Sequence, residues 1–116
     1  MKRALLGAMM AAIAPALAAA KTGSVEARVE SYNRCMMLAA VRASYTDAAN
    51  HRIYGIARAA CAAARDSRAV DRARQPVYLA AVDAADATRA TYLAGWVAEL
   101  RERRRASDAT SGMASH

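Results

Sequence analysis

The 116-residue sequence contains no phenylalanine, one tryptophan, two cysteines and two prolines. Its hydrophobic fraction is 56%, but 34 of these residues are alanines. An alanine buries only a methyl group, and burial stabilises a fold by about 25 cal/mol for each Å² of apolar surface removed from water. We therefore expect one small domain with a thin core, which disfavours enzymes that need a large substrate pocket.

Motifs that carry chemistry are also missing from the sequence. It has no glycine-rich phosphate loop, no nucleophile elbow, no cysteine–histidine metal box and no C-x-x-C-H haem attachment pattern. No pattern of alternating polar and apolar residues indicates a strand. We accordingly predict no catalytic residue, no metal ligand and no cofactor, and we favour a non-enzymatic protein over an enzyme.

The first twenty residues have the pattern of a secretory signal peptide. Lys2 and Arg3 form a charged start, residues 4–17 are uncharged and apolar, and three alanines ending at Ala20 suit signal peptidase. The alternative, a transmembrane anchor, needs about 20 strongly apolar residues, whereas this stretch is alanine-rich and interrupted by a proline. We predict cleavage after Ala20 and a periplasmic or secreted protein.

Lysine is nearly absent as well, since only two of the 17 basic residues are lysines. The formal charge is +7, and removal of Lys2 and Arg3 with the signal segment leaves +5. Export excludes nucleic acid as the expected partner, so an anionic envelope component, an envelope protein or a second copy of the chain is favoured. The arginines are spread over all three predicted helices, which favours a general compositional bias toward arginine and alanine over a dedicated binding face.

The two cysteines, Cys35 and Cys61, are predicted to form a disulfide in an oxidising compartment. Closing this loop stabilises the fold by about 3.5 kcal/mol in the chain-entropy model. The alternatives are two free thiols or a metal site. A metal site would have to recruit His51 or His116, the only histidines in the chain.

Turn-forming residues, Pro76 and the helical period of the apolar residues divide the mature chain into three predicted helices. The first spans about residues 24–43 with Ser24 as its N-cap, and a turn follows at 44–47. Thr46, Asp47 or Asn50 is the candidate cap of the second helix, at about 48–70. Pro76 separates this helix from a third that ends near Arg105. We therefore predict a helical domain at 21–105 and a flexible C-terminal tail at 106–116.

These helices predict an all-α fold. Because the midpoint between Cys35 and Cys61 falls in the predicted turn, the first two helices form an antiparallel, disulfide-linked hairpin, and the longer C-terminal helix completes a small three-helix bundle. Three arginines, recurring every seven residues on the second helix, are placed on its solvent side: Arg58, Arg65 and Arg72. The apolar stripe of the third helix is predicted to comprise Tyr78, Val82, Ala85, Arg89, Tyr92, Leu93, Trp96 and Leu100.

Arg89 interrupts this stripe, so its guanidinium needs a partner. One interpretation is an ion pair with Asp86 one turn earlier, extended by Asp83. The other is a ligand-binding arginine flanked by Tyr92 and Trp96 that recognises a carboxylate or phosphate.

Taken together, the sequence favours a small exported helical protein that acts as a non-enzymatic binding or interaction module. The alternatives are an enzyme or ligand carrier that uses Arg89, Tyr92 and His51, and a membrane-surface protein that binds through the basic run Arg101–Arg105.

Overall fold

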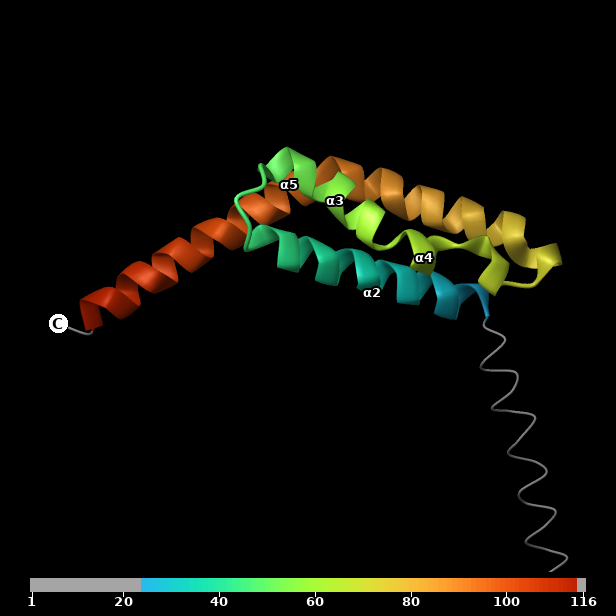
Figure 1. The fold of residues 1–116 in the computed structure, drawn as a ribbon, viewed down its shortest axis with the longest axis horizontal. Helices are drawn as coiled ribbons and strands as arrows, with labels where there is room; N and C mark the ends of the chain where they lie inside the picture. The colour runs from blue at the N-terminus through green and yellow to red at the C-terminus, as the bar shows by residue number, and fades with distance from the viewer. Residues whose placement is uncertain (1–23, 115–116) are drawn as a thin grey trace, which may run out of the picture.

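The computed structural model of the chain describes residues 24–114, and the predicted signal segment lies outside these residues. The predicted all-α class is confirmed (Figure 1). The described helices are α2 (Val25–Ser44), α3 (Ile53–Ala60), α4 (Ala62–Arg65) and α5 (Gln75–Ala114), with short 3₁₀ turns at Asn50–Arg52, Ser67–Ala69 and Arg72–Arg74.

Helix α2 begins as predicted. The side chain of Ser24 accepts a hydrogen bond from the backbone N–H of Ala27, and Glu26 lies in the first turn, where a negative charge is favourable. The helix ends at Ser44 in the predicted turn. None of the three candidate caps is used after it, because Ala49 precedes the next helical turn and makes no side-chain cap.

The predicted continuous helix over 48–70 is wrong, because the chain forms two separate helices there. Helix α3 ends at Ala60, because the φ of −104° and ψ of 16° at Cys61 interrupt the helix, and nothing in the local sequence marks this break. Helix α4 ends at Arg65, and the carboxylate of the next residue, Asp66, accepts a bond from the N–H of Arg68. Such a local bond competes with helix continuation, and the aspartate supplies a sequence reason for this second break.

Helix α5 is longer than predicted. Pro76 is its second residue, where a missing N–H leaves no helical bond unmade. The predicted end at Arg105 is wrong, because the helix continues to Ala114 through most of the predicted tail. Extending a formed helix adds about one hydrogen bond for each residue fixed, and no proline stands between Arg105 and Ala114 to stop it.

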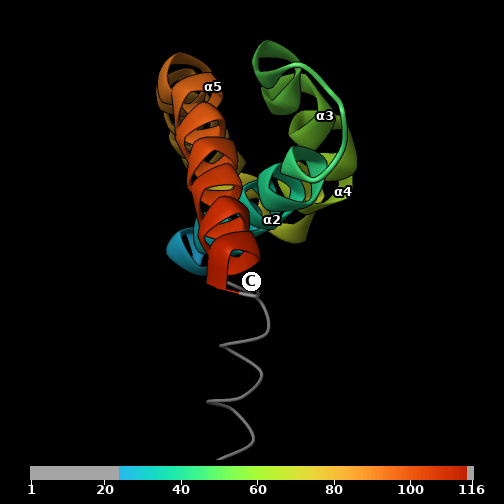
Figure 2. The same ribbon diagram turned by 90° about the vertical axis from the view of Figure 1, so that its left-hand side faces the viewer.

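The helices form a small bundle in which α2 packs against both α3 and α5 (Figure 2). The Cys35–Cys61 disulfide joins α2 to the junction of α3 and α4, with a Cα–Cα distance of 5.9 Å. The predicted disulfide-linked antiparallel hairpin is thereby confirmed. Helix α5 runs parallel to α2, since Asp86 meets Tyr32 and Arg101 meets Ser44.

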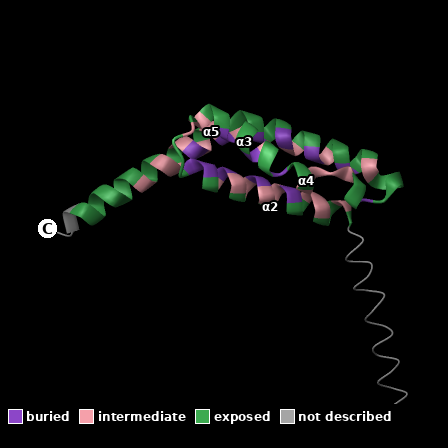
Figure 3. Ribbon diagram, in the orientation of Figure 1, coloured by how far each residue is buried: buried purple, intermediate pink, exposed green. Residues whose placement is uncertain are grey.

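The buried residues form two neighbouring clusters along the bundle, and Figure 3 shows that the C-terminal part of α5 lies outside both. The buried stripe of α5 differs from the predicted one in that Asp86 and Val97 belong to it, whereas Ala85, Trp96 and Leu100 are only partly buried and Tyr92 is 42% exposed. Its full membership is Tyr78, Val82, Asp86, Arg89, Leu93 and Val97.

The predicted solvent positions of Arg58 and Arg65 are also wrong. Both side chains turn toward α5 and are only 36% and 23% exposed. Arg72 lies outside the helices and is exposed. The inward turn of the first two arginines has an electrostatic cause, because the carboxylate of Asp86 lies between them.

Candidate functional site

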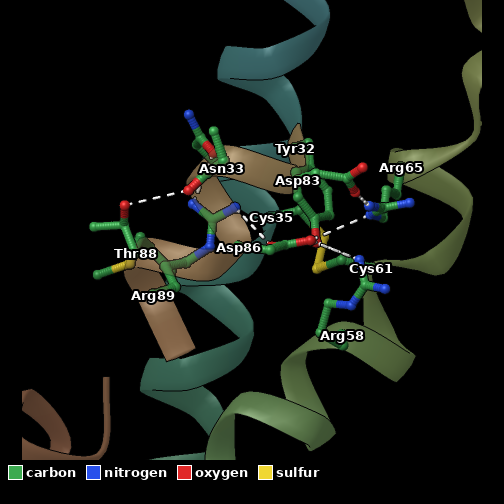
Figure 4. Close-up of polar contacts among 12 residues, drawn as sticks. Tyr32, Asn33, Cys35, Arg58, Cys61, Arg65, Asp83, Asp86, Thr88 and Arg89 are labelled. Carbon is green, nitrogen blue, oxygen red and sulfur yellow. Dashed lines mark hydrogen bonds and ion pairs between the residues drawn. A yellow bond between two sulfur atoms is a disulfide. The ribbon is translucent and has the colours of Figure 1, made fainter. Parts of the chain in front are cut away.

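The most densely connected polar group of the described chain is the carboxylate of Asp86, which is 5% exposed (Figure 4). The hydroxyl of Tyr32 donates to it at 2.7 Å. Arg58 Nη1 donates at 2.6 Å, Arg65 Nε at 3.2 Å and Arg89 Nη2 at 3.0 Å. We refer to these five residues, Tyr32, Arg58, Arg65, Asp86 and Arg89, as the Asp86 cluster.

Each helix of the bundle contributes to the Asp86 cluster. Asp86 and Arg89 lie one turn apart on α5, Tyr32 comes from α2, Arg58 from α3 and Arg65 from the end of α4. The interruption at Cys61 falls between the two inward arginines, and the disulfide holds this junction against α2. The cluster therefore exists only in the assembled bundle.

The predicted ion pair of Arg89 with Asp86 is confirmed. Asp83 extends the network as expected, although its partner is Arg65 rather than Arg89. Arg89 also donates to the side-chain oxygen of Asn33 at 2.7 Å, and its guanidinium lies 5.2 Å from the centre of the Tyr32 ring. The arginine that interrupts the apolar stripe is thus paired inside the bundle.

The environment of Asp86 favours its ionised form. Burial by itself would raise the pKa of this carboxyl group. Hydrogen bonds from Tyr32, Arg89 and Arg65, together with the charge of Arg58, outweigh burial and lower the pKa below its ordinary value. At neutral pH the cluster therefore contains a buried carboxylate anion.

The pKa values of the neighbouring groups also shift, in directions that favour a neutral tyrosine and charged arginines. Burial raises the pKa of the Tyr32 hydroxyl, so it stays protonated and donates to Asp86. The pKa of Arg58 is raised chiefly by its bond with Tyr32. For Arg65, burial lowers the pKa, but the bond to Asp86 and the charges of Asp83 and Asp86 raise it overall. At neutral pH the Tyr32 hydroxyl therefore stays neutral, and Arg58 and Arg65 stay charged beside the Asp86 carboxylate.

Among residues 24–114, no hydrogen bond or ion pair joins the three residues that are predicted to bind a ligand, Arg89, Tyr92 and Trp96. Arg89 faces Asp86 and Asn33, as described above. The Tyr92 hydroxyl lies at the surface, 3.9 Å from the sulfur of Met37, and Trp96 packs against the second core cluster. Ligand binding by Arg89, Tyr92 and Trp96 stays a prediction.

His51 is exposed in the 3₁₀ turn before α3, where it lines an open hollow with Asp47, Arg52 and Tyr54. Among residues 24–114 no contact joins it to Arg89 or Tyr92. Its role in the enzyme alternative also stays a prediction.

Comparison with known proteins adds no family. No family model, curated protein or solved structure matches this chain. The site is therefore interpreted from its own geometry.

Histidine, cysteine, aspartate and glutamate side chains do not gather anywhere in residues 24–114 in a group of three or more that could hold a metal ion. Within the same range, no helix combines the length and the apolar character needed to cross a membrane.

A second polar junction lies where α5 leaves the bundle. Arg101 donates to the carbonyl oxygens of Ser44 at 2.9 Å and Thr46 at 2.8 Å, and to the side-chain oxygen of Asn50 at 2.6 Å. One turn later, the guanidinium of Arg104 stacks over the ring of Tyr45 at 3.6 Å. Arg101 satisfies carbonyl groups at and just beyond the C-terminal end of α2, where a cation is favourable.

Sequence reasoning missed the roles of Arg58, Arg65 and Arg101. A helical count places Asp86 between Val82 and Leu93 on the buried face of α5, and a buried carboxylate needs cationic partners. That count was the available signal for the Asp86 cluster. The contacts of Arg101 have no counterpart in local sequence, since they join residues more than fifty positions apart.

Proposed function

We propose that this chain is an exported, non-enzymatic interaction module whose contact element is the exposed end of α5, residues 105–112, here called the C-terminal arm. The proposal rests on the observation that this helix extends beyond the bundle. Residues 105–112 are all exposed, and Figure 1 shows the C-terminal end of α5 running away from the bundle.

The arm adds little to the stability of the fold. Hydrophobic burial is the main favourable term in folding, and the exposed residues 105–112 contribute little of it. A helical segment this short is marginal in water by itself. As a continuation of the formed helix α5 it extends away from the bundle, where its exposed side chains are available to a partner.

The arm is attached to the bundle at a defined place. The bonds of Arg101 to the end of α2 and the stacking of Arg104 on Tyr45 tie α5 to the bundle immediately before the arm begins. An element held in one orientation loses less conformational entropy when it binds, which supports a binding role.

The chemistry of the arm favours a protein partner over a lipid surface. The basic run that leads into the arm is partly neutralised, because Arg103 pairs with Glu99 at 3.9 Å and Arg105, the first residue of the arm, with Glu102 at 2.5 Å. Ala106 and Ala109 are small enough to let another helix approach closely. We propose a helical segment of an envelope protein as the partner.

A site-specific photocrosslinker tests the contact element. Placed at Ala109 in the full chain in its native cell, it is expected to produce one dominant protein adduct. The matched control carries the crosslinker at Val77, which is 61% exposed at the other end of α5. Equal adducts at both positions, or none at Ala109, would contradict the proposal.

Export is supported by the disulfide, which persists in oxidising compartments, and by the predicted signal peptide. Mass spectrometry of the protein from fractionated cells tests it. We expect an envelope protein that begins at Lys21 and carries an oxidised cysteine pair. Recovery in the cytosol with both thiols reduced would contradict export.

A further inference from the structure

The surface beside the Asp86 cluster contains a hollow of about 380 Å³. It lies between α3, α4 and the start of α5. Its lining residues are Arg58, Ala62, Arg65, Asp66, Ser67 and Leu79. This volume falls within the range of about 300–1,000 Å³ that small-molecule sites occupy.

The charge on this side of the cluster is not balanced. The guanidinium groups of Arg58, Arg65 and Arg89 face only two carboxylates, those of Asp83 and Asp86. One positive charge is therefore in excess. Arg58 and Arg65 are the two members of the cluster that line the hollow, so the excess charge is accessible there.

Both of these arginines also have unused donors. Arg58 uses Nη1 for Asp86 and Tyr32, and Arg65 uses Nε and Nη2 for Asp86 and Asp83. Within residues 24–114, Nε and Nη2 of Arg58 and Nη1 of Arg65 donate to no protein group. Their guanidinium planes are meanwhile fixed by the bonds already made. Such fixed donors bind an oxyanion with less loss of side-chain entropy than free surface arginines do.

Asp66 also lines the hollow, but its negative charge is already compensated. Its carboxylate accepts bonds from the backbone and the guanidinium of Arg68, which lower its pKa to about 2. On the other walls, Ser67 offers a hydroxyl group and Leu79 an apolar surface that is 36% exposed. The hollow thus combines cationic donors, a hydroxyl and an apolar wall.

We propose that this hollow binds a small organic anion, with its carboxylate or phosphate oxygens on Arg58 and Arg65 and its apolar body against Leu79. The site is independent of the C-terminal arm and goes beyond the interaction role proposed for it. The anion supplies the negative charge that the cluster lacks.

The first test is a titration of the oxidised full-length mature protein, followed by ¹H–¹⁵N NMR. Phenyl phosphate and benzoate are the probes, inorganic phosphate tests the head group alone, and benzyl alcohol is the neutral control. We expect saturable shifts of the Ser67 amide and the Arg58 and Arg65 Nε–H signals with either organic anion, and none with benzyl alcohol. Saturation with phenyl phosphate or benzoate alone identifies which of the two head groups the site accepts. Shifts that do not saturate with either, or that benzyl alcohol reproduces, would overturn the proposal.

The second test compares variants by the Kd of the anion that saturates. Arg58→Gln is expected to weaken binding by roughly tenfold or more, because a hydrogen bond to a charged group contributes about 1.5–3 kcal/mol. The matched control is Arg72→Gln, which removes the same charge from an exposed position outside the hollow. Equal losses of affinity in the two variants would show that the effect depends only on net charge, and would overturn the proposed site.

Because Arg58 also belongs to the Asp86 cluster, a variant that leaves the cluster intact is needed. Ser67→Ala removes a lining hydroxyl that has no hydrogen-bond partner among the described residues. We expect it to weaken binding by roughly threefold or more, as loss of one ordinary hydrogen bond does, with an unchanged melting temperature. Unchanged affinity in both Arg58→Gln and Ser67→Ala would overturn the proposal.

Discussion

Replacing Asp86 with asparagine removes the anion on which three arginines converge. Removing one partner of a buried ion pair destabilises a protein by about 3–5 kcal/mol, because the other charge is left buried without a partner. Here only Arg89 is fully enclosed, with a side chain 6% exposed, whereas those of Arg58 and Arg65 are 36% and 23% exposed and can turn to water. We therefore expect the lower end of the range, about 3 kcal/mol.

Urea denaturation of the oxidised protein measures this loss. With a slope of about 1–3 kcal/mol per molar urea for a chain of this size, the midpoint should fall by about 1–3 M. The matched control is Asp83→Asn, which removes the same charge from a side chain that is 65% exposed. Its effect should stay within about 1 kcal/mol, as for surface ion pairs.

A double variant tests the cause assigned to this loss. If the stranded charge of Arg89 is responsible, adding Arg89→Met to Asp86→Asn should restore at least about 1 kcal/mol. Asp86→Asn with no greater effect than Asp83→Asn, or a double variant whose effects simply add, would refute the reasoning.

The same carboxylate determines a pH dependence. Because the pKa of Asp86 is lowered in the folded state, its stabilising contribution is present above the unfolded pKa of about 3.9. The contribution is lost as the pH falls through the folded value. The difference in unfolding free energy between the parent and Asp86→Asn should therefore shrink below about pH 4, and a constant difference down to pH 2 would contradict it.

Three more predictions concern the disulfide, the junction with the arm and a helix position. Replacing Cys35 and Cys61 with alanine should lower the free energy of unfolding by about 3.5 kcal/mol, and an unchanged urea midpoint would contradict a structural role for the bond. Arg101→Gln should destabilise the fold by about 1–3 kcal/mol and speed amide exchange in residues 45–50, whereas Arg103→Gln, 80% exposed, should do neither. Gly95→Ala should raise the melting temperature by a few degrees, since an added Cβ meets nothing within 4 Å and glycine is the poorer helix former by about 0.5–1 kcal/mol; a lower melting temperature would contradict open space there.

Helix α2 and the hairpin show how much of the fold can be predicted from local sequence. Ser24 as N-cap, the turn after Ser44 and the pairing of Cys35 with Cys61 were all predicted from residue types and spacing. Each depends on interactions within a few residues or on the meeting of two cysteines in one chain. The third helix was recognised for the same reason, through Pro76 and its apolar period.

The errors in the helix boundaries have two physical origins. The break at Cys61 lies in an alanine-rich stretch with no residue that interrupts a helix, and it falls at the residue that the disulfide joins to α2. The continuation of α5 past Arg105 follows from the low free energy of extending a formed helix, which outweighed the loop-like composition of the residues beyond it.

The sequence by itself determined that the chain is helical, favoured a bond between its two cysteines and offered Asp86 as one of two interpretations of the partner that Arg89 needs. It did so because helix periodicity, cap chemistry and i,i+3 pairing are local properties. Only the tertiary structure decided that Arg58 and Arg65 turn inward to the same carboxylate and that Arg101 ties α5 to the end of α2. Those contacts join different helices. The low dielectric around the buried Asp86 strengthens its attraction for Arg58 and Arg65, whereas Arg101 is held by carbonyl groups at the end of α2 that lack a helical partner.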